Sequence, residues 1–136
     1  MKKIRVYLQY PWKTSDSQYY KSMISDPPKG VDIISPIKNI GNITNVKKFS
    51  KSNKIKKYIR NIAKIVKIPN IIFPSKKTAN ADLIHCAHSL YLGNRPWVVD
   101  VEMYWSFASS YETAHSKLGK SRIKKILKRK SCKKIF

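Results

Sequence analysis

Glycine is scarce in this sequence, and its scarcity excludes the common nucleotide-binding loops. The 136 residues contain four glycines, and neither G-x-G-x-x-G nor G-x-x-x-x-G-K-[ST] occurs among them. The segment that follows the first apolar run is Tyr10-Pro11-Trp12-Lys13, which cannot wrap a pyrophosphate with bare backbone amides. We therefore do not expect a nucleotide bound in the Rossmann manner.

Cysteine and long apolar runs are also rare. The two cysteines, Cys86 and Cys132, form no C-x-x-C pair, which is typical of a reducing cytosol rather than of a disulfide framework. No stretch approaches the roughly 18 uninterrupted apolar residues of a membrane-spanning helix. The apolar run at the start is too short for a signal peptide and contains Arg5. We expect a cytoplasmic protein, with peripheral attachment to the inner face of the membrane as a further possibility.

Acidic residues are few, and this scarcity constrains the partners of the chain. Seven Asp and Glu stand against 29 Lys and Arg, for a formal charge of +22. No acid occurs between Asp32 and Asp82 or after Glu112. Such a balance favours polyanionic partners, namely nucleic acid, an anionic membrane surface or phosphorylated substrates. The alternative is compositional drift in a proteome rich in Lys, Ile and Asn, which requires no partner.

The length and the apolar pattern predict one α/β domain over residues 1–136. Short runs of apolar and β-branched residues alternate with helical segments, which favours a mainly parallel sheet with helices on both faces, in a Rossmann-like three-layer arrangement. The strands are expected at Lys3–Leu8, Val31–Ile34, Ile71–Phe73, Leu83–Cys86, Trp97–Val101 and Cys132–Phe136. Residues 35–48 are loop-like.

Two of the expected helices are strongly basic. The first is capped by Ser52 or Asn53 and closed by Pro69. It carries a stripe of 3.6-residue period made of Ile55, Ile59, Ile62 and Val66. The second is capped by Ser121 and has Ile123, Ile126 and Leu127 on its apolar face. We expect both stripes to pack inward against the sheet.

Two shorter helices are expected beside these. One is capped by Ser15 or Asp16 and runs to about Ile24. The other spans Tyr111 to Leu118, with Gly119 as its stop.

The end of the strand at Trp97–Val101 is the first candidate site. Asp100 and Glu102 are two residues apart, so both side chains are expected on the same side of the chain. Chemistry in open α/β folds gathers at the carboxyl ends of the strands, and two carboxylates there could orient sugar hydroxyls or supply a general base. The simpler alternative is that one of them caps the next turn or pairs with Arg95.

Two histidines lie nearby. His88 follows the end of the strand at Leu83–Cys86, where it could donate to a substrate oxygen or act as acid or base; the alternative is a polar loop histidine. His85 and Cys86 are adjacent and would point to opposite faces of a strand. We therefore expect a buried Cys86 and no metal site.

The basic helices also permit two interpretations beyond a solvated face. Lysines opposite an isoleucine stripe could hold the protein against anionic lipid headgroups. Nucleic acid could use the same charge. A single-strand binder would also need aromatic residues on an exposed platform, and these helices carry aliphatic residues with Tyr58 as the exception. Nucleic acid is therefore the less favoured partner.

The run AHSLYLGNRPWVVDVEMYWSF, followed by a basic helix and SCKKIF, resembles the N-terminal domain of GT-B-fold glycosyltransferases, in particular the group 1, family 4-like enzymes. The opening QYPWKTSDSQYY and the pair Pro27-Pro28 are similar to the start of the same family. The resemblance implies that this domain holds the acceptor, a glycan or a lipid-linked sugar. It also implies a second domain or chain that binds the nucleotide-sugar.

The resemblance carries expectations about individual residues. Asp100, Glu102 and His88 would line the catalytic cleft, although this chain lacks the histidine that many relatives have at the strand end. Gln9, Trp12, Lys13 and Tyr104 would contact the acceptor. No cofactor is expected on this chain, which looks truncated because the donor-binding half of the family is missing, so catalysis by it alone is not expected. The alternative from another class is a small, basic, non-catalytic nucleic-acid-binding domain.

Overall fold

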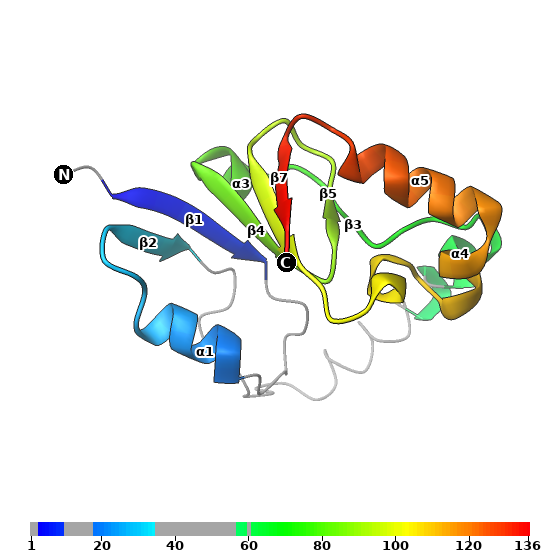
Figure 1. Ribbon diagram of the computed structural model, residues 1–136, viewed down its shortest axis with the longest axis horizontal. Helices are drawn as coiled ribbons and strands as arrows, with labels where there is room; N and C mark the ends of the chain where they lie inside the picture. The colour runs from blue at the N-terminus through cyan, green and yellow to red at the C-terminus, as the bar shows by residue number, and fades with distance from the viewer. Residues whose placement is uncertain (1–2, 10–17, 35–56, 60) are drawn as a thin grey trace.

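Five parallel strands form the central sheet of the computed structural model, which describes residues 3–9, 18–34, 57–59 and 61–136 (Figure 1). The strands lie in the order β2-β1-β4-β6-β7. This arrangement confirms the predicted α/β, Rossmann-like fold with a parallel sheet. The strand bounds are β1 Ile4–Gln9, β2 Val31–Ile34, β4 Leu83–Ala87, β6 Trp97–Asp100 and β7 Cys132–Ile135.

Helices cover both faces of this sheet, as the sequence predicted. On one face α5 (Lys117–Leu127) buries Ile123 and Ile126 against strand residues that include Ile84, Trp97 and Val99. On the other face α1 (Gln18–Ser25) buries Tyr20 against Leu8 and Ala87. Side chains of a strand alternate between its two faces, so β1, β2 and β4 contribute to both cores.

A second, two-stranded parallel ladder joins β3 (Ile71–Ile72) to β5 (Leu90–Tyr91). The sequence predicted β3 but not β5. The chain reverses after β4 at His88, whose φ of 54° lies in the left-handed region, and reverses again over residues 92–96 before β6. The carboxyl end of β5 therefore lies at the edge of the molecule where β4 and β6 begin. A short helix, α3 (Lys76–Ala79), lies beside that end.

The first basic helix does not bury its apolar stripe, which corrects the expectation. Among its described residues, 57–59 and 61–65 are helical, and the exposed fractions of Ile59, Ile62 and Val66 are 59%, 43% and 44%. The described cores of the sheet are formed with α1, α5 and the β3–β5 ladder, and none of the described residues of this helix belongs to them. Its carboxyl end is held by Arg122, which donates to the backbone oxygens of Val66 at 2.5 Å and Lys67 at 3.1 Å. The proposed caps Ser52 and Asn53 lie outside the described residues.

The junction between the last two helices also differs from the prediction. After a 3-10 turn, η1 (Tyr104–Phe107), helix α4 spans Tyr111–His115 and α5 begins at once. Gly119 is not a helix stop but lies in the first turn of α5, and a Cβ there would stand 1.8 Å from the Thr113 carbonyl oxygen. The cap is Ser116 rather than Ser121, because the Ser116 Oγ accepts from the Gly119 N–H at 3.0 Å and donates to the Thr113 oxygen.

The predicted short helix before Pro27 is confirmed as α1, and its proposed caps Ser15 and Asp16 lie outside the described residues. The described part of the chain contains no helix with the length and apolar character needed to cross a membrane.

The position of the cap gives a direct test of this junction. Ser116→Ala should lower the free energy of unfolding by about 0.5 to 2 kcal/mol, the usual cost of removing a helix cap. Ser121→Ala, an exposed position inside the same helix, should change it by less than about 0.5 kcal/mol. Urea unfolding followed by circular dichroism measures both. An equal or larger loss for Ser121→Ala would contradict this assignment of the helix start.

Candidate functional site

The Asp100 carboxylate, at the end of β6, lies between two other polar side chains. The Tyr20 hydroxyl of α1 donates to Asp100 Oδ2 at 2.5 Å. The Nε2 atom of His85, on β4, lies 3.5 Å from Asp100 Oδ1. His85 Nε2 and Asp100 Oδ1 are both buried, and the contact between them does not have the geometry of a hydrogen bond. Three elements that are distant in sequence therefore meet at one carboxyl group.

Strand register explains how these groups meet. In the parallel β4–β6 pair Ala87 stands beside Asp100, and His85 stands beside Val98. Because side chains alternate along a strand, His85 and Asp100 share one face of the sheet and lie diagonally across adjacent strands. This is the face that α1 covers, and Tyr20 is the buried side chain of that helix. Cys86 points to the opposite face and is fully buried, as predicted.

The neighbours of Asp100 hold it in the charged form. Burial alone raises the pKa of a carboxyl group, but the His85 and Tyr20 side chains outweigh it and leave the pKa of Asp100 below its ordinary value. The pKa of Tyr20 is raised, first by burial and then by its hydrogen bond to the Asp100 carboxylate. At neutral pH, Asp100 is therefore an acceptor and Tyr20 keeps its proton.

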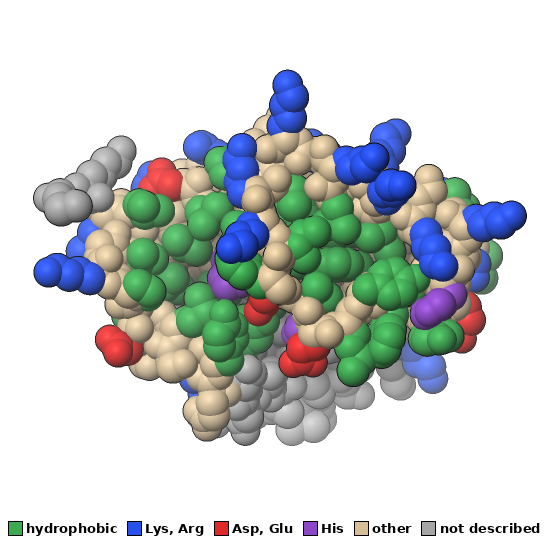
Figure 2. All heavy atoms as spheres, viewed as in Figure 1, with side chains coloured by type: hydrophobic (Ala, Val, Ile, Leu, Met, Phe, Trp, Pro, Cys, Tyr) green, Lys and Arg blue, Asp and Glu red, His purple; other side chains and the backbone are tan. Residues whose placement is uncertain are grey.

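A cavity of about 270 Å³ opens beside Asp100, at the carboxyl ends of β4, β6 and β7. Ligand sites of parallel α/β sheets occupy this edge. No Lys or Arg is among the described lining residues, in contrast with the charge of the whole chain. Figure 2 shows many Lys and Arg side chains along the upper and right rim, over α5 and β7, while acidic and histidine side chains lie near the lower centre of this face. The described lining residues are Tyr19, Tyr20, His88, Asp100, Val101, Glu102 and Phe136.

His88 and Glu102 bring free polar groups to this cavity. The backbone N–H of His88 donates to the Asp100 carbonyl at 3.0 Å, which fixes the chain in its left-handed turn. The Nδ1 atom of His88 is buried and has no hydrogen-bond partner. Glu102 is exposed and makes no hydrogen bond or ion pair within the described part of the chain. An imidazole and a carboxylate are thus available to a ligand next to two phenol rings.

The structure brings three of the predicted site residues together, namely His88, Asp100 and Glu102. Gln9 ends β1 half-buried and does not line this cavity. Tyr104 lies outside it, because its hydroxyl donates to the Ala114 carbonyl and its ring contacts His115. Trp12 and Lys13 lie outside the described residues.

Asp100 does not pair with Arg95, which was the alternative role considered for it. Arg95 lies at the opposite edge of the sheet and donates to the Ala79 carbonyl at 2.7 Å. Two polar residues of the site, Tyr20 and His85, were not predicted. The position of His85 along its strand indicates that it shares a face of the sheet with Asp100 only once the β4–β6 register is known. Nothing in the sequence near Tyr20 marks it as a partner of Asp100.

The described residues contain no group of three or more His, Cys, Asp and Glu side chains arranged to hold a metal ion. Comparisons with known protein families, curated proteins and solved structures found no match to this chain.

The contact between Tyr20 and Asp100 predicts a pH-dependent stability. Tyr20→Phe should lower the free energy of unfolding by about 1.5 to 3 kcal/mol near neutral pH, because it removes a hydrogen bond to a partly buried charge. The lowered pKa of Asp100 contributes stability above its unfolded pKa of about 3.9, and this stability is lost as the pH falls through the folded pKa. The effect of Tyr20→Phe should therefore shrink below about pH 4.

Urea unfolding across this pH range measures the effect, and Tyr19→Phe is the matched control. Tyr19 lines the same cavity and contacts the Tyr20 ring, but no hydrogen bond from its hydroxyl to Asp100 exists. Its substitution should change stability little at any pH. An effect of Tyr20→Phe that did not vary with pH would contradict the assigned role of Asp100.

Proposed function

We propose that this chain is the acceptor-binding domain of a glycosyltransferase and that the cavity beside Asp100 holds an acceptor hydroxyl. The observation that carries the proposal is the composition of this cavity. Two carboxylates and an imidazole lie beside tyrosine rings at the carboxyl edge of a parallel sheet, without a cationic side chain among the described lining residues.

This set of groups suits a neutral, hydroxyl-rich ligand. Ionised carboxylates accept hydrogen bonds from sugar hydroxyls, and aromatic rings offer apolar faces for the C–H groups of a sugar. Glu102 is the free carboxylate and would accept a hydrogen bond from the reacting hydroxyl. His88 would be a second hydrogen-bond donor or acceptor. Asp100 is already engaged by Tyr20 and His85 and would position the acceptor.

The family resemblance implies that a second domain or chain binds the nucleotide-sugar, and the described lining of this cavity includes no cationic side chain for its diphosphate. The isolated 136-residue chain should therefore bind an acceptor without transferring sugar to it. Sugar transfer from a nucleotide-sugar by this chain alone would contradict that part of the proposal.

A basic nucleic-acid-binding domain remains the second candidate. It is favoured by the exposed lysines of α5 and β7, which include Lys120, Lys124, Lys125, Lys133 and Lys134. Figure 2 shows Lys and Arg side chains along the rim over these two elements. The two functions differ in the ligand and in its response to salt. Binding of DNA or RNA falls steeply as salt rises, whereas binding of a neutral glycan does not.

The glycan proposal is tested with an array of immobilised oligosaccharides. The wild-type chain should retain a defined set of glycans at physiological salt, and Glu102→Gln should weaken that binding about tenfold through loss of a charged hydrogen bond. Exposed Glu112, on α4, is not among the described residues of the cavity, so Glu112→Gln is the matched control. Salt-sensitive DNA binding with no retained glycan would favour the second candidate.

Attachment to an anionic membrane is a further part of the proposal. The helical residues 57–59 and 61–65 leave Tyr58, Ile59, Ile62 and Ile65 exposed, with Lys57 and Lys64 beside them. Exposed aliphatic residues flanked by lysines are typical of helices that lie in a lipid–water interface. A lipid-linked acceptor would be presented at such a surface.

Vesicle co-sedimentation tests this attachment. The chain should bind phosphatidylcholine vesicles only when they contain phosphatidylglycerol, since each basic residue near an anionic surface contributes about 1 kcal/mol. Ile65→Ser removes a side chain that is 80% exposed and should weaken binding about tenfold through lost apolar burial. Leu118→Ser, at a 49% exposed position on α5, should not. Equal effects of the two substitutions would exclude the helix as the contact.

A further inference from the structure

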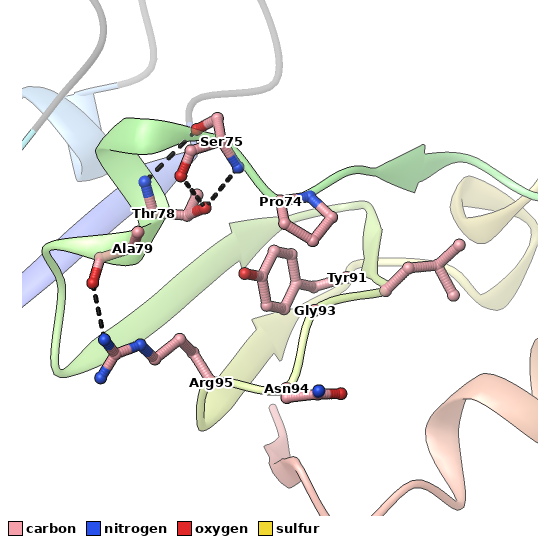
Figure 3. Close-up of a pocket in the computed structure, with 9 residues that line it drawn as sticks. Pro74, Ser75, Thr78, Ala79, Tyr91, Gly93, Asn94 and Arg95 are labelled. Atoms are coloured by element: carbon pink, nitrogen blue, oxygen red, sulfur yellow. Dashed lines mark hydrogen bonds between the residues drawn. The ribbon is translucent and has the colours of Figure 1, made fainter.

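A second cavity lies at the opposite edge of the sheet from Asp100. It has a volume of about 520 Å³ and lies between α3 and the turn that follows β5 (Figure 3). Its position follows from the topology. The β3–β5 ladder ends where β4 and β6 begin, so this cavity is separated from the proposed acceptor site by the length of the strands.

Tyr91 contributes an unusual polar group to this cavity. Its side chain is almost wholly buried, with 1% exposed, yet its hydroxyl makes no hydrogen bond within the described structure. Because Tyr91 lines the cavity and its hydroxyl has no hydrogen-bond partner in the described structure, this hydroxyl is available to a ligand. Figure 3 shows the Tyr91 ring at the centre of the cavity, with its hydroxyl directed between α3 and Arg95.

Gly93 is what allows Tyr91 to lie this way. A Cβ at Gly93 would stand 2.1 Å from both Cζ and the hydroxyl oxygen of Tyr91. Real Cβ atoms do not approach other atoms so closely, so any larger residue would displace the phenol end of the ring. The glycine and the tyrosine together place the hydroxyl in the cavity.

Arg95 supplies the charge. One terminal nitrogen of its guanidinium donates to the Ala79 carbonyl at 2.7 Å, which anchors the side chain beside α3. Arg95 lines the cavity and is exposed, and it pairs with no carboxylate among the described residues, so its other N–H donors are unpaired there. A guanidinium held in this way keeps a planar set of N–H donors that suits an oxyanion.

Hydroxyl groups of α3 add to the donors. The Ser75 Oγ accepts from the Thr78 N–H, and the Thr78 hydroxyl donates to the Ser75 carbonyl. The Ser75 hydroxyl hydrogen is not used in these bonds. No Asp or Glu is among the described lining residues, so the wall offers hydrogen-bond donors and a positive charge. The Asn94 amide is turned away and accepts instead from Arg129.

We propose that this cavity binds the phosphate group of a small phosphorylated molecule. The Arg95 guanidinium and the Tyr91 and Ser75 hydroxyls donate to the phosphate oxygens. The volume is in the range of sites that enclose whole small molecules, so the ligand has an organic part beyond the phosphate. That part lies against Pro74 and Leu92. The site is independent of the proposed acceptor cavity.

The experiment is an NMR titration of the full 136-residue chain with inorganic phosphate, glucose 1-phosphate and glucose, at constant ionic strength. Saturable amide shifts at residues 91–95 are expected with both phosphates and not with glucose. Tighter binding of glucose 1-phosphate than of inorganic phosphate would indicate a ligand with an organic part. Equal affinity would overturn that part of the proposal and leave free phosphate as the ligand.

Substitutions locate the site. Arg95→Gln should weaken phosphate binding about tenfold or more, and Tyr91→Phe, which keeps the ring, should weaken it several-fold. Arg95→Lys keeps the charge but loses the planar fork, and its binding should lie between those of the wild type and Arg95→Gln. Lys120→Gln is the control for loss of one positive charge on exposed α5 and should leave binding unchanged.

Thermal unfolding of each variant shows whether it still folds. Non-saturating shifts spread over the lysine-rich surface would overturn the proposal, as would binding that Arg95→Gln and Tyr91→Phe leave intact. Such results would show screening of the general positive charge and no site.

Discussion

The hydrogen bond from Tyr20 to Asp100 is the contact on which the carboxyl edge of the sheet depends. A carboxylate in a poorly solvated place destabilises a fold unless its oxygens are paired. Tyr20 supplies one partner from α1, and His85 approaches the other oxygen from β4. The helix over this face of the sheet is therefore fixed by the same charge that borders the cavity. Fold and candidate site cannot be altered separately at this point.

The parallel sheet could be predicted because each of its strands has a recognisable pattern in the local sequence. Residues 31–34, 83–86 and 97–101 are short apolar runs bounded by proline, glycine or polar residues, and each became a strand within about a residue of the expected ends. The same reasoning located Asp100 and His88, since a polar residue that directly follows a buried strand lies at its carboxyl end in any parallel arrangement. The inward face of α5 followed from the spacing of Ile123 and Ile126.

The remaining features depend on contacts that no local pattern contains. Tyr20 and His85 meet Asp100 only because of the strand register and the position of α1. The isoleucine stripe of residues 59–66 has helical spacing, but periodicity gives the apolar side of a helix and not the surface that would cover it. The start of α5 was misplaced because glycine usually stops a helix. At Gly119 the absence of a side chain instead lets the Thr113 carbonyl approach the helix.

The distribution of charge distinguishes the two cavities further. At physiological salt the field of a charge decays over about 8 Å, so the net charge of +22 acts on each cavity mainly through its nearest side chains. Beside Asp100 these are acidic and aromatic, which disfavours an anion and is the reason for proposing a neutral, hydroxyl-rich ligand there. Beside Tyr91 they are Arg95 and hydroxyls, with the lysines of α3 close by, which favours an anion. A chain this basic attracts phosphate through its many Lys and Arg side chains, even without a dedicated binding site. Its few acids are therefore most informative where they face a cavity, and Asp100 and Glu102 do so together.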